Sequence, residues 1–310
     1  MSARELQLSV GSGAARRARE RVWTGLAFAA PAIVGLLWFT AFPVISSLYY
    51  SFCNYRVLKP PVFIGGGNYR RLFEDPLFFT SLWNTAYYAA FAVPLGIVLA
   101  LALAMLLNTG VRGLAIYRTC FYVPSVVPIV ASAVLWIWLL SPQEGAVNDL
   151  LRMVGVKEGP GWFQSPEWSK PAIILWSLWN VGGGMVIFLA GLQDVPKELH
   201  EAAALDGARP LAQFRNVTLP FISPQILFNL VMGLIGAFQF FTPAYVMTNG
   251  SGGPVDSTTF YSLYLFNVAF SDFKMGYACA MAWVLLLVVL SATTLVLRSS
   301  ARLVYYGGDA

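Results

Sequence analysis

The chain has 310 residues, of which 57% are apolar and only 11% charged; its mean hydropathy is +0.64 and its formal net charge is +5 at pH 7. This composition excludes an ordinary soluble globular domain and is typical of an integral membrane protein. Three cysteines scattered along the chain exclude a disulfide framework and a cysteine-ligated metal site.

Six segments lack Asp, Glu, Lys and Arg over a length that can cross a bilayer, which takes about 20 residues. After trimming at proline, glycine and polar clusters, each segment predicts one transmembrane helix. The expected fold class is therefore an all-α integral membrane domain with six transmembrane helices. The segments are 22–55, 76–111, 119–143, 171–193, 216–255 and 275–297.

Basic residues orient these helices, because Lys and Arg gather in cytoplasmic segments. Six spans place both termini on one side, and the segments on that side hold 12 of the 20 Lys and Arg residues, including Arg16, Arg17, Arg19 and Arg21. Both termini are therefore expected in the cytoplasm, and the positive charge indicates topology and anionic lipid rather than nucleic acid. The apolar run from Val22 is about twice as long as a signal-peptide core, so it is expected to remain as an anchor.

The segments outside the spans divide the chain. The expected parts are a cytoplasmic tail (1–21), a first span with its outer loop (22–77), a core membrane domain (78–297) and a second cytoplasmic tail (298–310). The first 15 residues are small and polar and predict a disordered tail. The first outer loop, 49–77, is rich in turn formers, and the second, 141–170, contains an amphipathic stretch from Val147 to Val154. The segment 257–271 is too short and polar for a seventh span and is expected at the membrane interface.

The sequence offers no energy source of its own. It contains no Gly-Lys dipeptide, and hence no phosphate-binding loop of the G-x-x-x-x-G-K-[ST] type. The predicted spans lack Asp, Glu, Lys, Arg and His, the side chains that couple ions or carry protons in pumps and secondary transporters. No nucleophile–base cluster or metal-ligand spacing is present, so neither enzyme activity nor a cofactor is expected. The lone His200 is expected to be a solvated helix residue.

A polar interruption between the fourth and fifth predicted spans carries the most specific pattern. Pro196 and the acids after it predict a helix start, since acids favour the positive end of a helix and proline tolerates its first turn. The alanines 202–204 combine high helix propensity with little bulk, so a partner can approach closely. Gly207 predicts a left-handed turn, and Pro210 begins a second short helix that carries Phe214 as an apolar knob. The same pattern also fits an amphipathic helix-turn-helix on the membrane surface.

The sequence Glu201-Ala-Ala-Ala-Leu-Asp-Gly-Ala, followed by Phe214 and Leu219-Pro220, resembles a cytoplasmic loop of importer permeases of the ATP-binding-cassette (ABC) class. That loop reads E-A-A-x-x-D-G-A, then Phe six residues later, then Leu-Pro. In the family it forms a coupling helix that sits in a cleft of the cytoplasmic ATPase, so that closure of the ATPase dimer moves the permease. The resemblance assigns loop 194–221 to this role. The implied contact residues are Glu201, Ala202, Ala203, Asp206, Gly207 and Phe214.

Further similarity, spread over residues 25–297, points to the carbohydrate-uptake, maltose-type branch of these permeases, which glycerol-phosphate permeases share. Its matches include Ala190-Gly191-Leu192-Gln193, Thr248-Asn249-Gly250, Gly252-Gly253-Pro254 and Gly276-Tyr277-Ala278. The resemblance implies a type I ABC importer permease fold in a bacterial or archaeal cytoplasmic membrane. It also implies import of a sugar or sugar-like solute by alternating access, with a cytoplasmic ABC ATPase dimer, a second homologous permease and an extracytoplasmic solute-binding protein as partners.

Two helix faces are candidates for the solute site, because Trp can stack on a sugar and Asn can hydrogen-bond a hydroxyl. On the fourth span, the spacing i, i+3, i+4, i+7 joins Trp176, Trp179, Asn180 and Gly183. On the fifth span, the same spacing joins Gly233, Gly236, Ala237 and Phe240, with Gln239 beside them. A second interpretation is that the glycines allow close helix packing and the tryptophans mark the interface. The Gly182–Gly184 run likewise fits either a hinge or close packing.

Two alternatives to the ABC permease come from other classes. A secondary transporter would need a coupling site built from backbone and neutral side chains. A membrane-embedded enzyme or receptor would have to use the outer loops.

Overall fold

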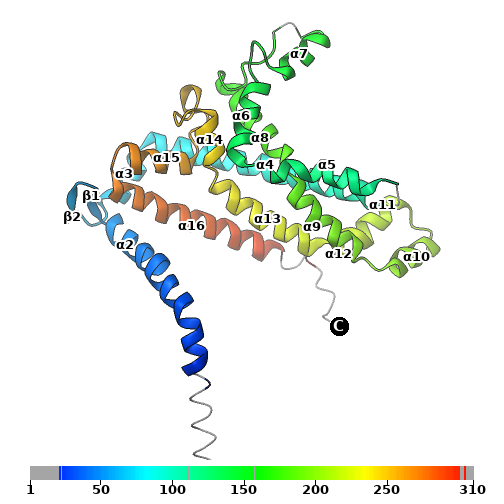
Figure 1. The fold of residues 1–310 in the computed structure, drawn as a ribbon, viewed down its shortest axis with the longest axis horizontal. Helices are drawn as coiled ribbons and strands as arrows, with labels where there is room; N and C mark the ends of the chain where they lie inside the picture. Colours follow the sequence, from blue (N-terminus) through cyan, green and yellow to red (C-terminus); the bar gives the residue numbers. More distant parts are fainter. Residues whose placement is uncertain (1–20, 22, 110–111, 157, 301–303, 305–310) are drawn as a thin grey trace, which may run out of the picture.

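The structure is a computed structural model that describes residues 21, 23–109, 112–156, 158–300 and 304, so the predicted disordered tail at 1–15 lies outside the described residues. In the described part the chain is mostly helical, and several long helices run side by side through the body of the molecule (Figure 1).

Among the described residues, three helices are each long and apolar enough to cross a membrane, and three bent helix pairs pass the same test as pairs. The single helices are Trp23–Ser51, which ends in α2 (Phe42–Ser51), α4 (Pro76–Leu107) and α16 (Met275–Ser300). The pairs are α5 (Leu114–Val126) with α6 (Ile129–Leu139), α8 (Pro166–Trp179) with α9 (Gly182–Gln193), and Pro210–Phe221 with α13 (Ser223–Phe238). Each predicted span matches one of these six, which confirms the predicted fold class.

None of these bends was predicted as such, although the hinge interpretation of the Gly182–Gly184 run falls at the 46° bend between α8 and α9. The largest, 97° between α5 and α6, falls at Val127, which precedes Pro128 and is extended with ψ near 131°. A residue before proline is disfavoured in the helical region, so the helix stops there. The bend of 65° before α13 falls at Ile222, close to Pro224, and the bend of 46° between α8 and α9 falls just before Gly182.

The first outer loop is more ordered than its turn-rich sequence indicates. The first helix ends at Ser51, close to the predicted start of this loop, and an antiparallel hairpin of β1 (Cys53–Arg56) and β2 (Lys59–Phe63) follows, then α3 (Gly67–Glu74). Buried Asn68 donates 2.8 Å hydrogen bonds to the carbonyl oxygens of Ser51 and Cys53, which ties α3 to the hairpin. Gly276, at the start of α16, touches the hairpin backbone so closely that an added Cβ would overlap the Cys53 carbonyl oxygen.

The remaining elements are short. The predicted amphipathic stretch of the second outer loop is α7 (Ala146–Met153). After α13 come α14 (Thr242–Met247), η3 (Pro254–Asp256), α15 (Tyr261–Phe266) and η4 (Asn267–Ser271). Segment 257–271 is not among the candidate spans of the described residues, as predicted. Within the molecule it is largely buried, since Tyr261 and Leu263 are fully covered where α15 packs on α4 and α16.

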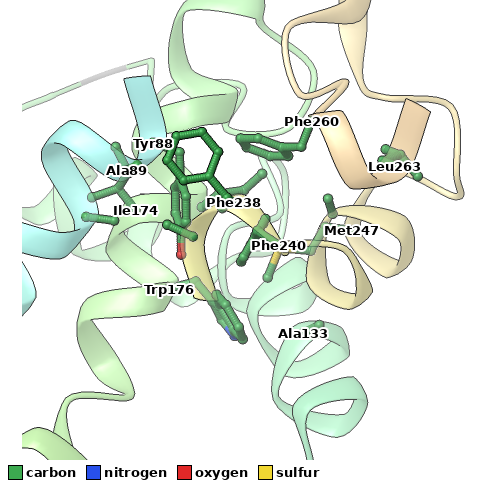
Figure 2. Packing of buried hydrophobic residues seen from close by; sticks show 14 residues of the cluster. Tyr88, Ala89, Ala133, Ile174, Trp176, Phe238, Phe240, Met247, Phe260 and Leu263 are labelled. Carbon is green, nitrogen blue, oxygen red and sulfur yellow. The ribbon is translucent and has the colours of Figure 1, made fainter. Parts of the chain in front are cut away.

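Helix α4 is the central helix and packs against α8, α9, α13 and α15. An aromatic cluster beside it joins Tyr88 of α4, Trp176 of α8, and Phe240 and Phe260 from the segments after α13 (Figure 2). By contrast, the most apolar window of helix Trp23–Ser51 has no buried residue. That helix needs lipid or another subunit to cover it.

Candidate functional site

The predicted coupling loop forms a helix, a left-handed turn and a second helix. Helix α10 (Lys197–Leu205) begins directly after Pro196, as predicted. The turn that follows the helix contains Gly207, whose φ is +77°. The Gly207 amide donates to the Ala204 carbonyl (3.0 Å), and the Ala208 amide donates to the Ala203 carbonyl (2.9 Å). These two bonds define a Schellman turn, and an added Cβ at Gly207 would meet nothing within 4 Å. The requirement for glycine is therefore conformational rather than steric.

The second helix is fixed to this turn and continues into the fifth span. The Gln213 side-chain amide donates to the Ala208 carbonyl (3.0 Å) from the end of α11 (Pro210–Gln213). A π-helical turn, η2 (Phe214–Thr218), and α12 (Leu219–Phe221) follow. Pro220 has no amide hydrogen, which removes one ordinary helical bond next to the π-turn. The Leu-Pro pair of the motif thus lies where the π-helical turn η2 gives way to the α-helical turn α12.

The loop presents a surface that the other described residues do not cover. Of the predicted contact residues, Glu201, Ala202, Asp206 and Gly207 are exposed, and Ala203 is half-buried. Two leucines that the sequence reasoning missed are the most prominent apolar groups on the loop. They are Leu205 at 90% exposure and Leu211 at 77%. Their position on either side of the Asp-Gly turn is the signal that would have indicated them.

Phe214, predicted as an apolar knob, is half-buried instead. It lines a cavity of about 230 Å³ between the loop and the inner ends of α4 and α9. His200, predicted to be solvated, is half-buried in the same cavity beside Gln213. Phe214 therefore lies between the loop and the membrane helices, while the two leucines point to solvent.

The candidate residues of the fourth span do not share one continuous face, because the helix breaks among them. Trp176 is 4% exposed and donates its indole N–H to the Ser132 hydroxyl (2.9 Å), so it is a core residue. Trp179 is half-buried and meets the Trp136 ring edge-on, with centroids 6.1 Å apart. Asn180 ends α8 and donates to the Trp176 carbonyl oxygen (3.2 Å). Gly183, beyond the bend, is exposed.

The candidate residues of the fifth span divide between a cavity and the core. Gly233, Gly236 and Ala237 line a cavity of about 250 Å³ between α4, the α8–α9 pair and α13. Phe240 is buried and packs on the Tyr88 ring with centroids 4.4 Å apart, while Gln239 is exposed.

Three polar side chains of this cavity were missed from the sequence: Tyr88, Ser177 and Asn229. Asn229 lies four residues before Gly233, so extending the predicted face of the fifth span by one turn would have found it. None of the described lining residues is charged. The cavity can offer hydroxyl and amide groups to a neutral polar molecule.

The two interpretations of the glycines each hold at different positions. An added Cβ at Gly182 would lie 2.8 Å from the Phe121 carbonyl oxygen of α5, and one at Gly233 would lie 2.9 Å from Val93 of α4. These glycines permit close helix packing. At Gly183 and Gly236 an added Cβ would meet nothing within 4 Å. Those two leave open space on the helix surface.

Charged side chains lie in the bent helix pairs, outside the predicted charge-free windows. Helix α8 begins at Pro166, five residues before its window, and therefore includes Glu167 and Lys170. The window 171–193 itself contains no charged residue, as predicted. The Lys170 ammonium lies at the outer end of α8, away from the cavity-lining Ser177.

Comparison with known proteins gives a consistent result. Residues 92–304 match the family model described as "Binding-protein-dependent transport system inner membrane component". The chain is 43% identical to "Probable ABC transporter permease protein YesP" of Bacillus subtilis (strain 168), over 94% of each protein. It is 36% identical to "Lactose transport system permease protein LacF" of Rhizobium radiobacter, over 86% of this chain and 90% of that protein.

The fold matches a chain from the crystal structure of a bacterial ABC transporter involved in the import of the acidic polysaccharide alginate. The TM-score is 0.78 at 24% identity, and the match covers 93% of this chain and 99% of that one.

Proposed function

The chain belongs to the inner membrane components of binding-protein-dependent transport systems, and on this premise we propose that it imports a sugar or sugar-like solute by alternating access. As a member of this family it is a multi-pass permease subunit of an ABC importer with the type I permease fold, and not an enzyme. ATP would be hydrolysed on separate subunits, to which loop 194–221 connects.

The observation that carries the solute class is the uncharged cavity between α4, the α8–α9 pair and α13. Its polar groups are the Tyr88 and Ser177 hydroxyls and the Asn229 amide, set among small and apolar residues. Such groups can hydrogen-bond sugar hydroxyls without the desolvation cost of a charge. The relative named for lactose transport supports the same class.

The same cavity disfavours two alternatives. A glycerol-phosphate-type solute carries a charged phosphate, for which the described lining offers no Lys or Arg. A secondary transporter coupled through ionisable side chains would need at least one such group near the solute, and none lines this cavity among the described residues. A neutral saccharide agrees best with these groups.

The contact with the ATPase is assigned to the exposed surface of α10 and its turn. Glu201, Ala202, Asp206 and Gly207 would lie at the contact, with Leu205 as the apolar group that enters the ATPase cleft. Ala203 would support the helix from its half-buried face, and Phe214 would transmit movement from the loop to α4 and α9 through the cavity that it lines.

Three further features of the assembly are part of this proposal. The uncovered window of helix Trp23–Ser51 would pack on a second, homologous permease or on lipid. The open outer side would receive an extracytoplasmic solute-binding protein. Both termini would lie in the cytoplasm with the coupling loop, as the distribution of basic residues indicates.

A pull-down followed by reconstitution tests the proposal. The chain is solubilised with loop 194–221 either intact or scrambled, and co-purifying proteins are identified by mass spectrometry. An ABC ATPase and a second permease should accompany only the intact loop, and the complex in vesicles should import solute only when ATP is hydrolysed. Uptake that persists after the nucleotide site of the ATPase is disabled would refute an ABC importer.

A further inference from the structure

A second, larger cavity lies at the outer ends of the membrane helices and has no part in the proposed solute path. It measures about 510 Å³ and lies between the hairpin, α3, the start of α4, α15 and the start of α16. Its lining includes five charged residues: Arg56, Arg71, Glu74, Asp75 and Lys274. The partners of these charges determine what the cavity can bind.

The two acids of the cavity are already engaged within the chain. Asp75 accepts hydrogen bonds from the hydroxyls of Tyr264 (2.5 Å) and Tyr277 (2.6 Å) and from the Leu77 amide (3.0 Å). Glu74 forms an ion pair of 3.0 Å with Arg70, which lies on the same helix and does not line the cavity. Neither carboxylate is left to neutralise a cation across the cavity.

Of the three cations that line the cavity, one has an ion-pair partner and two do not. Lys274 forms a 2.8 Å ion pair with Asp272. Arg56 of β1 and Arg71 of α3 are exposed, and neither has an ion pair or a side-chain hydrogen bond among the described residues. Two guanidinium groups therefore line one cavity without a direct ion-pair partner among the described residues, although the carboxylates of Glu74 and Asp75 line the same cavity. A planar guanidinium matches the paired oxygens of a phosphate or carboxylate better than any other side chain does.

The surroundings indicate which kind of anion the cavity would bind. The cavity lies where three membrane helices begin or end, at Ser51, Pro76 and Met275. The hairpin and α3, which contribute to its lining, also carry exposed apolar side chains, including Phe63 at 66% exposure and Phe73 at 74%. Cations next to apolar and aromatic groups at the end of a span are typical of the headgroup level of a bilayer. A free anion would gain nothing from these apolar neighbours, whereas a lipid would.

We propose that Arg56 and Arg71 bind the headgroup phosphate of an anionic phospholipid in the outer leaflet. The acyl chains would run along the apolar residues of the hairpin and along helix Trp23–Ser51, whose apolar window is not covered by the chain. Because the hairpin and α3 both contribute, the lipid would link the first span to the rest of the helices. The inference does not depend on which solute is transported.

Native mass spectrometry of the purified importer complex tests this inference. The delipidated complex is incubated with mixed micelles of equal parts phosphatidylglycerol and phosphatidylcholine, and the retained lipids are counted. Wild type should retain phosphatidylglycerol in preference to phosphatidylcholine. The double variant Arg56→Gln/Arg71→Gln should bind phosphatidylglycerol about tenfold or more weakly, since each basic group near a lipid surface contributes about 1 kcal/mol.

Lys59→Gln is the matched control, because Lys59 is an exposed cation of the same hairpin that does not line the cavity and pairs with no acid among the described residues. It should retain the lipid as wild type does. Equal retention by the double variant at an unchanged melting temperature would overturn the proposal. So would displacement of phosphatidylglycerol by excess inorganic phosphate, which would identify a free anion as the ligand. A double variant that keeps the lipid but loses stimulation by the solute-binding protein would instead assign the arginines to protein docking.

Discussion

The Lys170 ammonium donates a 2.9 Å hydrogen bond to the side-chain carbonyl of Asn84, 86 residues earlier in the chain. Asn84 is 2% exposed, and its amide donates in turn to the backbone carbonyls of Asp256 (2.8 Å) and Thr259 (3.2 Å). Lys170 also lies over the Tyr87 ring, 5.1 Å from its centre. One buried amide therefore joins α4, α8 and the outer loop that follows α14.

Removal of this amide should destabilise the outer half of the molecule. Asn84→Ala removes the side-chain donor to the buried Thr259 carbonyl and the acceptor of the Lys170 ammonium, while the Asp256 carbonyl keeps the Thr259 amide as a donor, so we expect a loss of about 2 kcal/mol in stability. Lys170→Met removes a single donor and should cost about 1 kcal/mol. Thermal unfolding in detergent measures both. Lys59→Met, on the exposed strand β2, is the control and should melt as wild type does, and a melting temperature for Asn84→Ala equal to that of the control would contradict the prediction.

The positions of the spans could be predicted because the membrane imposes a strong, local requirement on sequence. Charge-free windows of sufficient length located all six helices or helix pairs. The same rule cannot locate the ends of the helices, because a window defined by the absence of charge stops at the first charged residue even where the helix continues. Lys170 lies one residue outside the window 171–193 but inside α8. A lysine at the end of a span can be tolerated when neutral groups interact with its ammonium, as the Asn84 side-chain carbonyl and the Tyr87 ring do here.

Bends, pairing and packing could not be predicted, because they depend on contacts between distant segments. The hairpin sequence Lys59-Pro-Pro reads as a turn, and its strands depend on Asn68, which bonds to the preceding backbone. The solute face of the fourth span assumed a straight helix, whereas the bend before Gly182 places Trp176 in the core. The coupling turn was predicted correctly because Gly207 alone determines its backbone.

The exposed leucines of the coupling loop give a prediction about the ATPase. Leu205→Asp and Leu211→Asp place a charge where an apolar contact is expected, so co-purification of the ATPase should fall about tenfold or more. Leu58→Asp is the matched control, since Leu58 is 95% exposed on the outer hairpin, on the other side of the membrane. Quantitative mass spectrometry of the purified complex measures the ratio of ATPase to permease. If Leu58→Asp lowered the ratio as much as Leu205→Asp, the leucines would have no specific role.

The left-handed turn of the loop gives a second coupling prediction. Gly207→Ala adds a Cβ that touches nothing but must adopt φ near +77°, at a cost of about 1 kcal/mol. We expect partial fraying of α10 and lower solute-stimulated ATPase activity, with normal insertion into the membrane. Gly66→Ala is the control, because its added Cβ is also unobstructed and its φ is −74°. Normal coupling in Gly207→Ala would show that the contact tolerates a distorted turn.

Adjacent glycines at the bend of the fourth span should respond differently to the same change. Gly182→Ala forces a methyl group to within 2.8 Å of the Phe121 carbonyl oxygen, which requires α5 and α9 to separate. Overpacking of this kind costs about 1–3 kcal/mol. Gly183→Ala meets no atom within 4 Å and should be neutral or slightly stabilising, since alanine favours a helix. Thermal unfolding measures the stability of both variants, and Gly182→Ala should melt at a lower temperature than Gly183→Ala. Equal melting temperatures would refute close packing at Gly182.

The Asp75 carboxylate should make stability depend on acid pH. Burial raises the pKa of this group, but hydrogen bonds from Tyr264, Tyr277 and the Leu77 and Phe78 amides outweigh burial and hold the pKa below its usual value. A depressed folded-state pKa stabilises the protein above the unfolded pKa of about 3.9, and the stabilisation disappears as pH falls through the folded value. The melting temperature of wild type should therefore exceed that of Asp75→Asn by a constant margin above about pH 5.

That margin should shrink as the pH falls below about 4, because the protonated wild-type carboxyl no longer accepts the tyrosine hydroxyls as a charged group. Thr80→Ala is the control, because it removes an exposed hydrogen bond to the Pro76 carbonyl near the start of α4 without changing a titratable group, so its margin should not vary with pH. Melting curves in detergent from pH 3 to pH 7 measure the effect. A margin between wild type and Asp75→Asn that is the same at both ends of this range would show that the tyrosines bind the neutral carboxyl as well as the charged one. The link from α4 to α15 and α16 would then depend on shape rather than on charge.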